Sequence, residues 1–332
     1  MSRVEQFLLG SGFSPAAVHV GLLNNMPDAG LRATELQFAR LLKDASGNLD
    51  VRLRLFSLGS ITRSEETRTR MAGFYDDAAF LEAAGLDALI VTGGAPDEDY
   101  LRSEPYWMEL SQLVDWAQAN TISTLFSGLA APAAVLHLDG VSHRPLPAPL
   151  LGVYASVRAE DDPLFFNSAP SVPVPHVRRH ELASADLKAA GYRVLAELDS
   201  NIGVGGDGVG GQADIFTRET PGESRFVFLQ GHPEYDPGTL ARLHLKDMER
   251  FLSGATKTRP SLPEHFFDRA TEDRLAQVAN DLQAYRTVVT SALPRQVWQS
   301  HGARLFSNWL MLVAAAKARR VANKSVSTRR RA

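Results

Sequence analysis

Along the first part of the chain, segments with the apolar pattern of a strand alternate with segments that have the apolar pattern of a helix. Residues 18–23 form a short apolar run, which predicts a buried strand, and residues 31–42 carry apolar side chains at helical spacing. Residues 51–58 alternate apolar side chains with arginines, which is typical of a half-exposed strand. The same patterns predict strands at residues 88–92 and 122–126 and helices at residues 78–84, 105–120 and 129–138.

This alternation predicts an α/β protein whose doubly wound, mostly parallel sheet is flanked by helices. Sites in such sheets form where the carboxyl end of a strand turns into the next helix, here at residues 24–28, 92–97 and 126–129. The proline-rich stretch 145–175 predicts an irregular excursion on the side of the active site. Further strands are predicted at residues 192–198, 213–217 and 225–229, and C-terminal helices at residues 236–254, 273–292 and 296–317.

The composition is that of a globular protein, because 44% of the 332 residues are apolar and 22% are charged. No apolar run approaches the length of a membrane span, and the first residues lack the pattern of a signal peptide, so we expect a cytoplasmic protein. Cysteine is absent. Its absence excludes disulfides, thiolate metal sites and thiol nucleophiles from the chemistry of this chain.

The charge is divided unevenly along the chain. Residues 317–332 hold seven basic residues and no acidic one, which leaves 28 basic and 38 acidic residues, a net charge of −10, on the rest. A basic tail can bind nucleic acid or another acidic surface. The low apolar content favours the alternative, a disordered, solvated tail over residues 316–332. We expect one domain over residues 17–315, preceded by an N-terminal extension over residues 1–16.

Two patterns resemble ligand-binding motifs but lack the context that those motifs need. The glycine-rich stretch 203–211 is followed by a predicted strand, whereas a dinucleotide-binding loop is followed by a helix, so a turn between strands is the better interpretation. His176 and His180 have the spacing of metal ligands on a helix, but Pro175 precedes them and no glutamate lies between them. We interpret both histidines as loop residues and predict no metal site.

The strongest local signal is the segment Gly231-His-Pro-Glu-Tyr-Asp236, which directly follows the apolar run 226–229. It puts an imidazole and a carboxylate two residues apart at the end of a strand. His232 could take a proton from a nucleophile while Glu234 fixes its tautomer and stabilises the imidazolium. For an isolated pair, a structural histidine beside a solvent-facing glutamate would be the better interpretation.

A second element favours the catalytic interpretation of that pair. Residues 124–131 predict a strand, a sharp turn and the start of a helix, which is the shape of a nucleophile elbow. The apex of such an elbow lies at a helix N-terminus, whose N–H groups and positive dipole end can stabilise an oxyanion. Ser127 and Gly128 lie at this apex.

Together these segments resemble the MetA-type homoserine O-acyltransferases (the homoserine O-succinyltransferase family), whose fold is similar to that of class I glutamine amidotransferases. The resemblance covers about residues 17–315. It includes, in the same order along the chain, residues 25–27, 89–93, 106–107, 123–126, 152–154, 175–178, 231–236, 300–302 and 308–310.

The resemblance implies transfer of a succinyl or acetyl group from a CoA thioester to the homoserine hydroxyl, a step of methionine biosynthesis. In that family an elbow cysteine forms an acyl thioester, with a histidine and a glutamate as its partners. His232 would then be the general base and Glu234 its orienting carboxylate. Arg178 would be able to pair with a substrate carboxylate. Glu98 corresponds to the residue with which the family distinguishes acyl donors, in an alignment that is ambiguous by one residue, so the donor stays open.

The chain departs from the family pattern at four positions. Gly128 occupies the position of the cysteine, and a glycine suits the strained backbone of an elbow. Val177 replaces a serine, Pro149 a lysine, and Lys246 the arginine that is thought to hold the homoserine carboxylate. The adjacent Ser127 offers a hydroxyl, but side chains one residue apart point in different directions.

The motifs and the departures from the family pattern leave two hypotheses for the function, one an enzyme and one a non-catalytic protein. The first is an O-acyltransferase with acyl-CoA as co-substrate and no bound cofactor, in which either Ser127 is acylated or His232 activates the acceptor for direct attack. The second is a non-catalytic relative that binds or regulates, motivated by the four departures. A glutaminase is a poorer third option, since it relies on the same thiol. As partners we expect acyl-CoA, a homoserine-like amino acid and a second copy of the chain in a homodimer, rather than nucleic acid or a membrane.

Overall fold

The protein is described by a computed structural model, in which residues 16–93, 101–199, 211–292, 294–295 and 297–329 are placed. These residues form a ten-stranded sheet with the strand order β3-β2-β1-β4-β5-β10-β9-β8-β6-β7. The first six of these strands run parallel to one another, and each of the last four pairs antiparallel with the strand before it. The α/β fold with a large, mostly parallel sheet is therefore confirmed.

The strands of the parallel half of the sheet are short and, except for the edge strand β3, largely buried, which is expected for strands covered by helices on both faces. Their bounds are β1 Val18–Asn25, β2 Val51–Ser57, β3 Tyr75–Asp77, β4 Ala88–Gly93, β5 Ser123–Gly128 and β10 Arg225–Leu229. The antiparallel half consists of β6 Arg144–Arg158, β7 Ser171–Glu181, β8 Arg193–Leu198 and β9 Ala213–Arg218.

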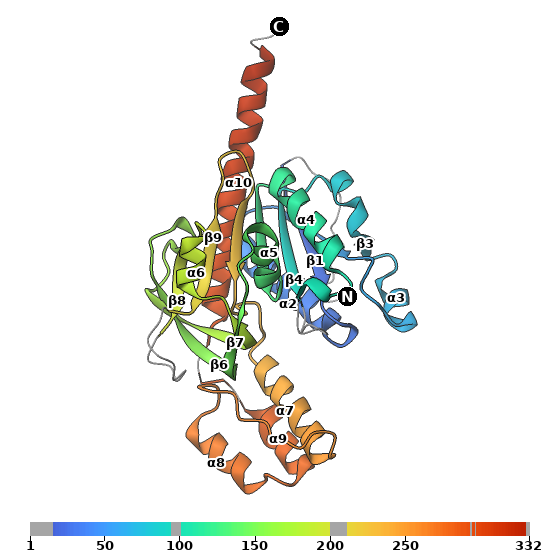
Figure 1. The fold of residues 1–332 in the computed structure, drawn as a ribbon, viewed down its shortest axis with the longest axis vertical. Helices are drawn as coiled ribbons and strands as arrows, with labels where there is room; N and C mark the ends of the chain where they lie inside the picture. Colours follow the sequence, from blue (N-terminus) through green and yellow to red (C-terminus); the bar gives the residue numbers. More distant parts are fainter. Residues whose placement is uncertain (1–15, 94–100, 200–210, 293, 296, 330–332) are drawn as a thin grey trace.

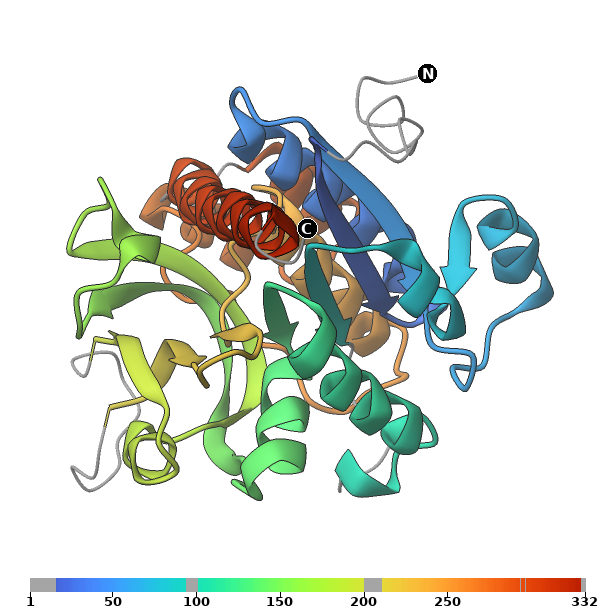
Figure 2. The same cartoon turned by 90° about the horizontal axis from the view of Figure 1, so that it is seen from above.

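Helices cover both faces of the sheet and enclose two apolar cores. Helices α2 (Asp28–Ser46) and α10 (Gln299–Arg329) pack on the face that presents Leu125. Helices α4 (Trp107–Asn120), α5 (Ala130–Asp139) and α6 (Ser184–Ala189) pack on the face that presents Phe126 (Figure 2). Strand β5 therefore contributes alternate side chains to opposite cores.

A third, smaller core lies below the sheet in Figure 1. It joins α7 (Thr239–Leu252), α8 (Arg269–Gln277) and α9 (Leu282–Ser291) to the ends of β6 and β7. Helix α7 begins shortly after β10 and the Gly231–Asp236 segment, so this lobe starts directly at the predicted site. Short elements complete the fold: α3 (Glu65–Met71), and the 3₁₀ turns η1 (Ala78–Phe80), η2 (Glu82–Ala84), η3 (Leu101–Ser103) and η4 (Pro163–Phe165).

Four local predictions differ from the structure. The stretch 145–175 is largely β6 and β7, because β7 lies at the sheet edge, where a proline without an N–H is tolerated. His176 and His180 therefore lie on a strand. Residues 78–84 form two 3₁₀ turns, and residues 273–292 form two helices separated by the Asp281 N-cap. Residues 203–210 of the glycine-rich stretch lie outside the described residues.

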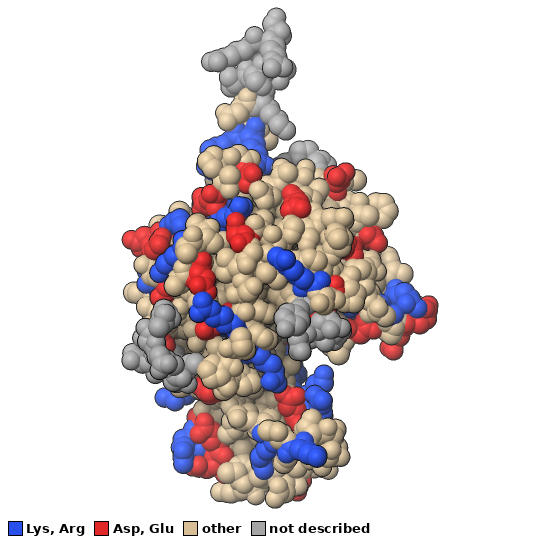
Figure 3. All heavy atoms as spheres, viewed as in Figure 1, with Lys and Arg blue, Asp and Glu red and all other residues tan. Residues whose placement is uncertain are grey.

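Helix α10 leaves the body of the molecule at its C-terminal end (Figure 1). It continues to Arg329 because no glycine or proline follows Gly302 to stop it, so the segment expected to be a disordered tail begins as helix. Lys317 still contacts the body through the Asp87 carboxylate at 2.7 Å. Lys and Arg side chains gather where the helix emerges (Figure 3). No described helix is long and apolar enough to cross a membrane.

Candidate active site

The predicted elbow is formed by β5 and α5. Gly128, the last residue of β5, has φ +61°, a left-handed conformation that favours glycine, and α5 begins two residues later at Ala130. Neighbouring strands bring Asn25 at the end of β1 and Gly93 at the end of β4 into register with this position. No side-chain hydrogen bond caps the first turn of α5, so its first N–H groups have no partner of that kind.

His232 and Glu234 form a hydrogen-bonded pair in the connection between β10 and α7. His232 Nδ1 lies 2.8 Å from Glu234 Oε1, and the Glu234 side chain is only 4% exposed. The imidazole also stacks on the Tyr235 ring, with centroids 4.3 Å apart and planes 6° apart. With Nδ1 donating to the carboxylate, Nε2 keeps its lone pair and can accept a proton.

The elbow and the pair face each other. A Cβ atom built on Gly128 would lie 2.9 Å from His232 Cε1 and 3.6 Å from Nε2. The Cε1–Nε2 edge of the imidazole thus faces the position that a side chain of residue 128 would occupy, with Cε1 the nearer of the two atoms. Parallel pairing of β5 with β10 produces this arrangement, because the carboxyl ends of both strands lie at the same edge of the sheet.

Ser127 lies on a different side of β5. Its side chain follows the alternation that directs Leu125 toward α2 and α10, and the residue is 2% exposed. On the same face, Trp309 Nε1 donates to Ser123 Oγ at 2.9 Å. No hydrogen bond joins Ser127 to His232 among the described residues.

The three remaining predicted residues lie in different environments. Arg178, on β7, donates to Gln212 Oε1 at 2.8 Å and to Gln230 Oε1 at 3.3 Å, and it forms no ion pair within the described part of the chain. Lys246 is exposed on α7. Glu98 lies outside the described residues.

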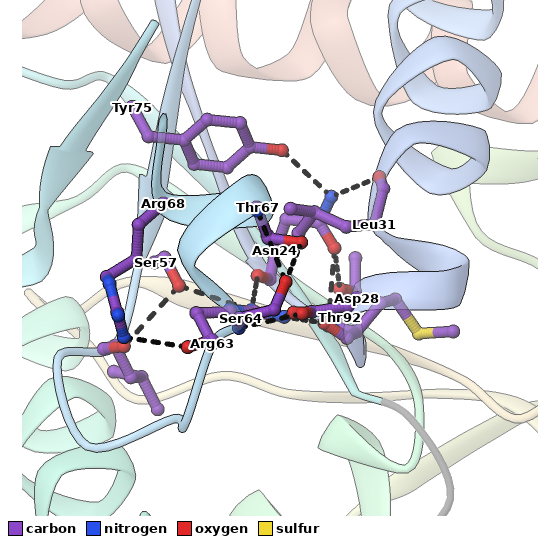
Figure 4. Close-up of polar contacts among 12 residues, drawn as sticks. Asn24, Asp28, Leu31, Ser57, Arg63, Ser64, Thr67, Arg68, Tyr75 and Thr92 are labelled. Atoms are coloured by element: carbon purple, nitrogen blue, oxygen red, sulfur yellow. Dashed lines mark hydrogen bonds and ion pairs between the residues drawn. The ribbon is translucent and has the colours of Figure 1, made fainter. Parts of the chain in front are cut away.

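A buried arginine that the sequence did not indicate shapes the first of the three predicted turns. Arg63 contacts the carbonyl oxygens of Asn24 and Met26, and its guanidinium is 3.3 Å from Asp28 Oδ1 (Figure 4). The Asp28 carboxylate accepts from Ser64 N at 2.9 Å. Burial would raise the pKa of Asp28, but the hydrogen bonds from Ser64 and its neighbours lower it to about 2. Arg63 follows a polar stretch without any pattern, so the sequence offered no signal for it.

Comparison with known proteins decides the family. The family model of homoserine O-succinyltransferase matches residues 14–319. A homoserine O-succinyltransferase of Rhodopseudomonas palustris is 45% identical over 307 residues, which cover 90% of this chain and 89% of that protein. One of Methylorubrum extorquens is 45% identical over 306 residues, covering 90% and 87%. The chain belongs to the homoserine O-succinyltransferase family.

Solved structures add more distant likenesses to this family member. A glutamine amido transferase from Methylobacillus flagellatus is 11% identical, with a TM-score of 0.48 over 90% of this chain and 96% of that chain. A glutamine amidotransferase from Thermotoga maritima is 13% identical, with a TM-score of 0.45 over 89% and 98%. The described residues of the family member contain no group of three or more His, Asp or Glu side chains that could hold a metal ion.

Proposed function

We propose that this chain transfers an acyl group from acyl-CoA to the hydroxyl of homoserine or a related amino-alcohol, as in methionine biosynthesis. Its relatives carry the name homoserine O-succinyltransferase and match nearly the full chain. The observation that carries the proposal is the edge of the His232 ring that faces the elbow and includes Nε2, with Nδ1 on the other side of the ring held by Glu234. A base oriented in this way suits the removal of a proton from an acceptor hydroxyl.

The transfer runs without an acyl-enzyme thioester, because the chain contains no cysteine. His232 Nε2 takes the hydroxyl proton while the acceptor oxygen attacks the thioester carbonyl. The new C–O bond replaces the C–S bond, and the departing CoA thiolate receives the proton from the imidazolium. Glu234 stabilises the charged imidazole between these two proton transfers.

The open end of α5 stabilises the oxygen of the tetrahedral intermediate. Its first N–H groups, those of Ala130 and Ala131, lie just beyond Gly128 in a helix of ten residues, whose dipole favours a negative charge there. Positioning and oxyanion stabilisation contribute to the rate independently of a covalent intermediate. The loss of the nucleophile therefore leaves a site that can still accelerate direct transfer.

The proposed reaction has two substrates, an acyl donor and an acceptor amino acid. The donor is acyl-CoA as co-substrate, with succinyl and acetyl groups as the alternatives. On the acceptor side, Arg178 and Lys246 are the cations that we assign to the substrate carboxylate. Arg178 already donates to two neutral amide oxygens, so a carboxylate would meet a preoriented guanidinium.

The test is a coupled assay of acetyl-CoA and succinyl-CoA against homoserine and serine, read by release of free CoA thiol. The wild type is expected to turn over, and His232→Ala is expected to lose the activity. Turnover that survives in His232→Ala would refute the proposed base. Calorimetric binding of both substrates without product would favour a binding or regulatory protein.

Intact-mass measurement distinguishes direct transfer from acylation of Ser127. Direct transfer predicts no added acyl mass on incubation with acyl-CoA and unchanged activity in Ser127→Ala. A mass increase of one acyl group that Ser127→Ala removes would establish the serine route instead.

A further inference from the structure

A buried carboxylate lies directly behind the turn that carries His232. Asp214, on β9, is 1% exposed. Its Oδ1 accepts from the backbone N–H of Gly231 at 3.1 Å, and its Oδ2 accepts from the Ser156 hydroxyl. The Nε2 of His176, a residue with no exposed surface, lies 3.3 Å from Oδ1.

The surroundings keep this carboxylate ionised. Burial raises the pKa of Asp214, but His176, Ser156 and the nearby Arg178 together lower it below the usual value. Burial lowers the pKa of His176, so its imidazole is neutral at pH 7. An ionised carboxylate accepts a stronger hydrogen bond from an N–H than a neutral group does, which favours a firm bond from Gly231.

A side chain of β9 and a backbone carbonyl of β7 hold the turn at two successive N–H groups. His232 N donates to Pro175 O at 2.8 Å, one residue after the Gly231 bond to Asp214. There is no space for a side chain at Gly231, because a Cβ there would lie 2.4 Å from Val174 Cγ1 and 2.9 Å from Asp214 Oδ1. The backbone that leads into His232 is thus fixed from behind, while its imidazole faces Gly128 on the other side.

We propose that Asp214 is a positioning residue, which anchors the Gly231 N–H and so holds His232 toward the elbow. The inference rests on the proposed function, in which His232 is the base. Asp214 touches neither substrate nor the reacting atoms, and it acts through one backbone bond. A displacement of the turn by a fraction of an ångström would misdirect Nε2, and such errors cost large factors in rate.

The test compares Asp214→Ala, Asp214→Asn and a matched control, Asp162→Ala. The side chain of Asp162 is also 1% exposed, and it pairs with Arg225 at the opposite end of β10, at 2.8 Å. Asp214→Ala is expected to lower kcat about 10- to 100-fold with little change in the KM for acyl-CoA. Asp214→Asn keeps an acceptor oxygen and is expected to recover most of the activity. Asp162→Ala is expected to lose stability but to keep kcat.

Amide hydrogen exchange of the 230–234 segment supplies a readout besides activity. Asp214→Ala is expected to accelerate exchange there, whereas Asp162→Ala is not. An unchanged kcat in Asp214→Ala, or an equal loss in Asp162→Ala, overturns the inference. If the wild type has no acyltransferase activity, the proposed function fails, while unaltered exchange in Asp214→Ala would separately refute the anchor.

A milder variant covers the case in which Asp214→Ala does not fold. Ser156→Ala removes one hydrogen bond to the Asp214 carboxylate and leaves the charge in place. It is expected to accelerate exchange in the 230–234 segment and to lower kcat by a few fold at unchanged KM. Wild-type exchange together with wild-type kcat in Ser156→Ala would contradict the anchor.

Discussion

A single methyl group at the elbow tests the geometry of the proposed site. Gly128→Ala adds a Cβ whose ideal position lies 2.9 Å from His232 Cε1, whereas ordinary contacts begin near 3.4 Å. The imidazole must therefore move by about 0.5 Å. It is held on one side by Glu234 and on its face by Tyr235, so the movement also disturbs the pair that orients Nε2.

The expected loss of activity follows from this displacement. Misplacement of a reacting group by 1 Å can cost about 100-fold in rate, so a shift of half that size predicts a fall in kcat of about tenfold. The backbone adds a separate effect on stability, because a left-handed alanine costs about 1–2 kcal/mol. Gly140→Ala provides the matched control: Gly140 has φ +70° at the other end of α5, and its Cβ would meet nothing within 4 Å.

The assay measures released CoA with a thiol reagent, which has no background from the enzyme because the chain contains no cysteine. Both variants are expected to lose a similar free energy of unfolding, measured by urea denaturation, and only Gly128→Ala is expected to lose kcat. Equal activity in Gly128→Ala and Gly140→Ala would refute the reasoning that His232 works against the elbow.

Three further predictions concern the same turn and the pH dependence of stability. Glu234→Gln removes the charge that stabilises the imidazolium and is expected to lower kcat about 10- to 100-fold in steady-state kinetics; an unchanged kcat would remove Glu234 from the mechanism. Gly302→Ala puts a Cβ 2.7 Å from Pro233 O, which displaces the turn that carries His232, and it is expected to lower kcat several-fold. Wild-type kinetics in this variant would contradict the prediction. Burial lowers the pKa of His244 from 6.5 to about 4, so below pH 6.5 the unfolded chain binds a proton that the native state excludes. The free energy of unfolding should fall by about 2 kcal/mol between pH 7.5 and pH 5 through this residue. Urea titrations should show a smaller loss in His244→Gln, and an equal loss would contradict the assignment.

The parts of the site that lie within one local segment could be predicted from the sequence. The elbow at Gly128 needs only a strand, a glycine and a helix in succession, and the structure forms them there. His232 and Glu234 are two residues apart in one turn, so their 2.8 Å contact also depends on local geometry. Their meeting across β5 and β10 followed from the general rule that parallel strands place their carboxyl ends together.

Segments without a clear period were predicted less well. The proline-rich stretch 145–175 showed no alternation, yet it pairs into β6 and β7. β7 is an edge strand, and the prolines of β6 precede its pairing with β8, which begins at Ser156, so few ladder N–H groups are missed. The pattern over residues 273–292 indicated one helix, but Asp281 caps a second one.

The tertiary structure alone decided which polar residues support the site. Asp214 and His176 are 38 residues apart, and Arg63 and Asn24 are 39 residues apart, so neither contact leaves a periodic signal in the sequence. Burial makes these contacts necessary for stability, because a charged group removed from water must form its hydrogen bonds with other groups of the protein. The sequence by itself determined the elements, the elbow without a nucleophile and the base opposite it. Packing of distant strands determined the direction of that base, since only the folded sheet brings Asp214 and Pro175 to the two backbone N–H groups that hold it.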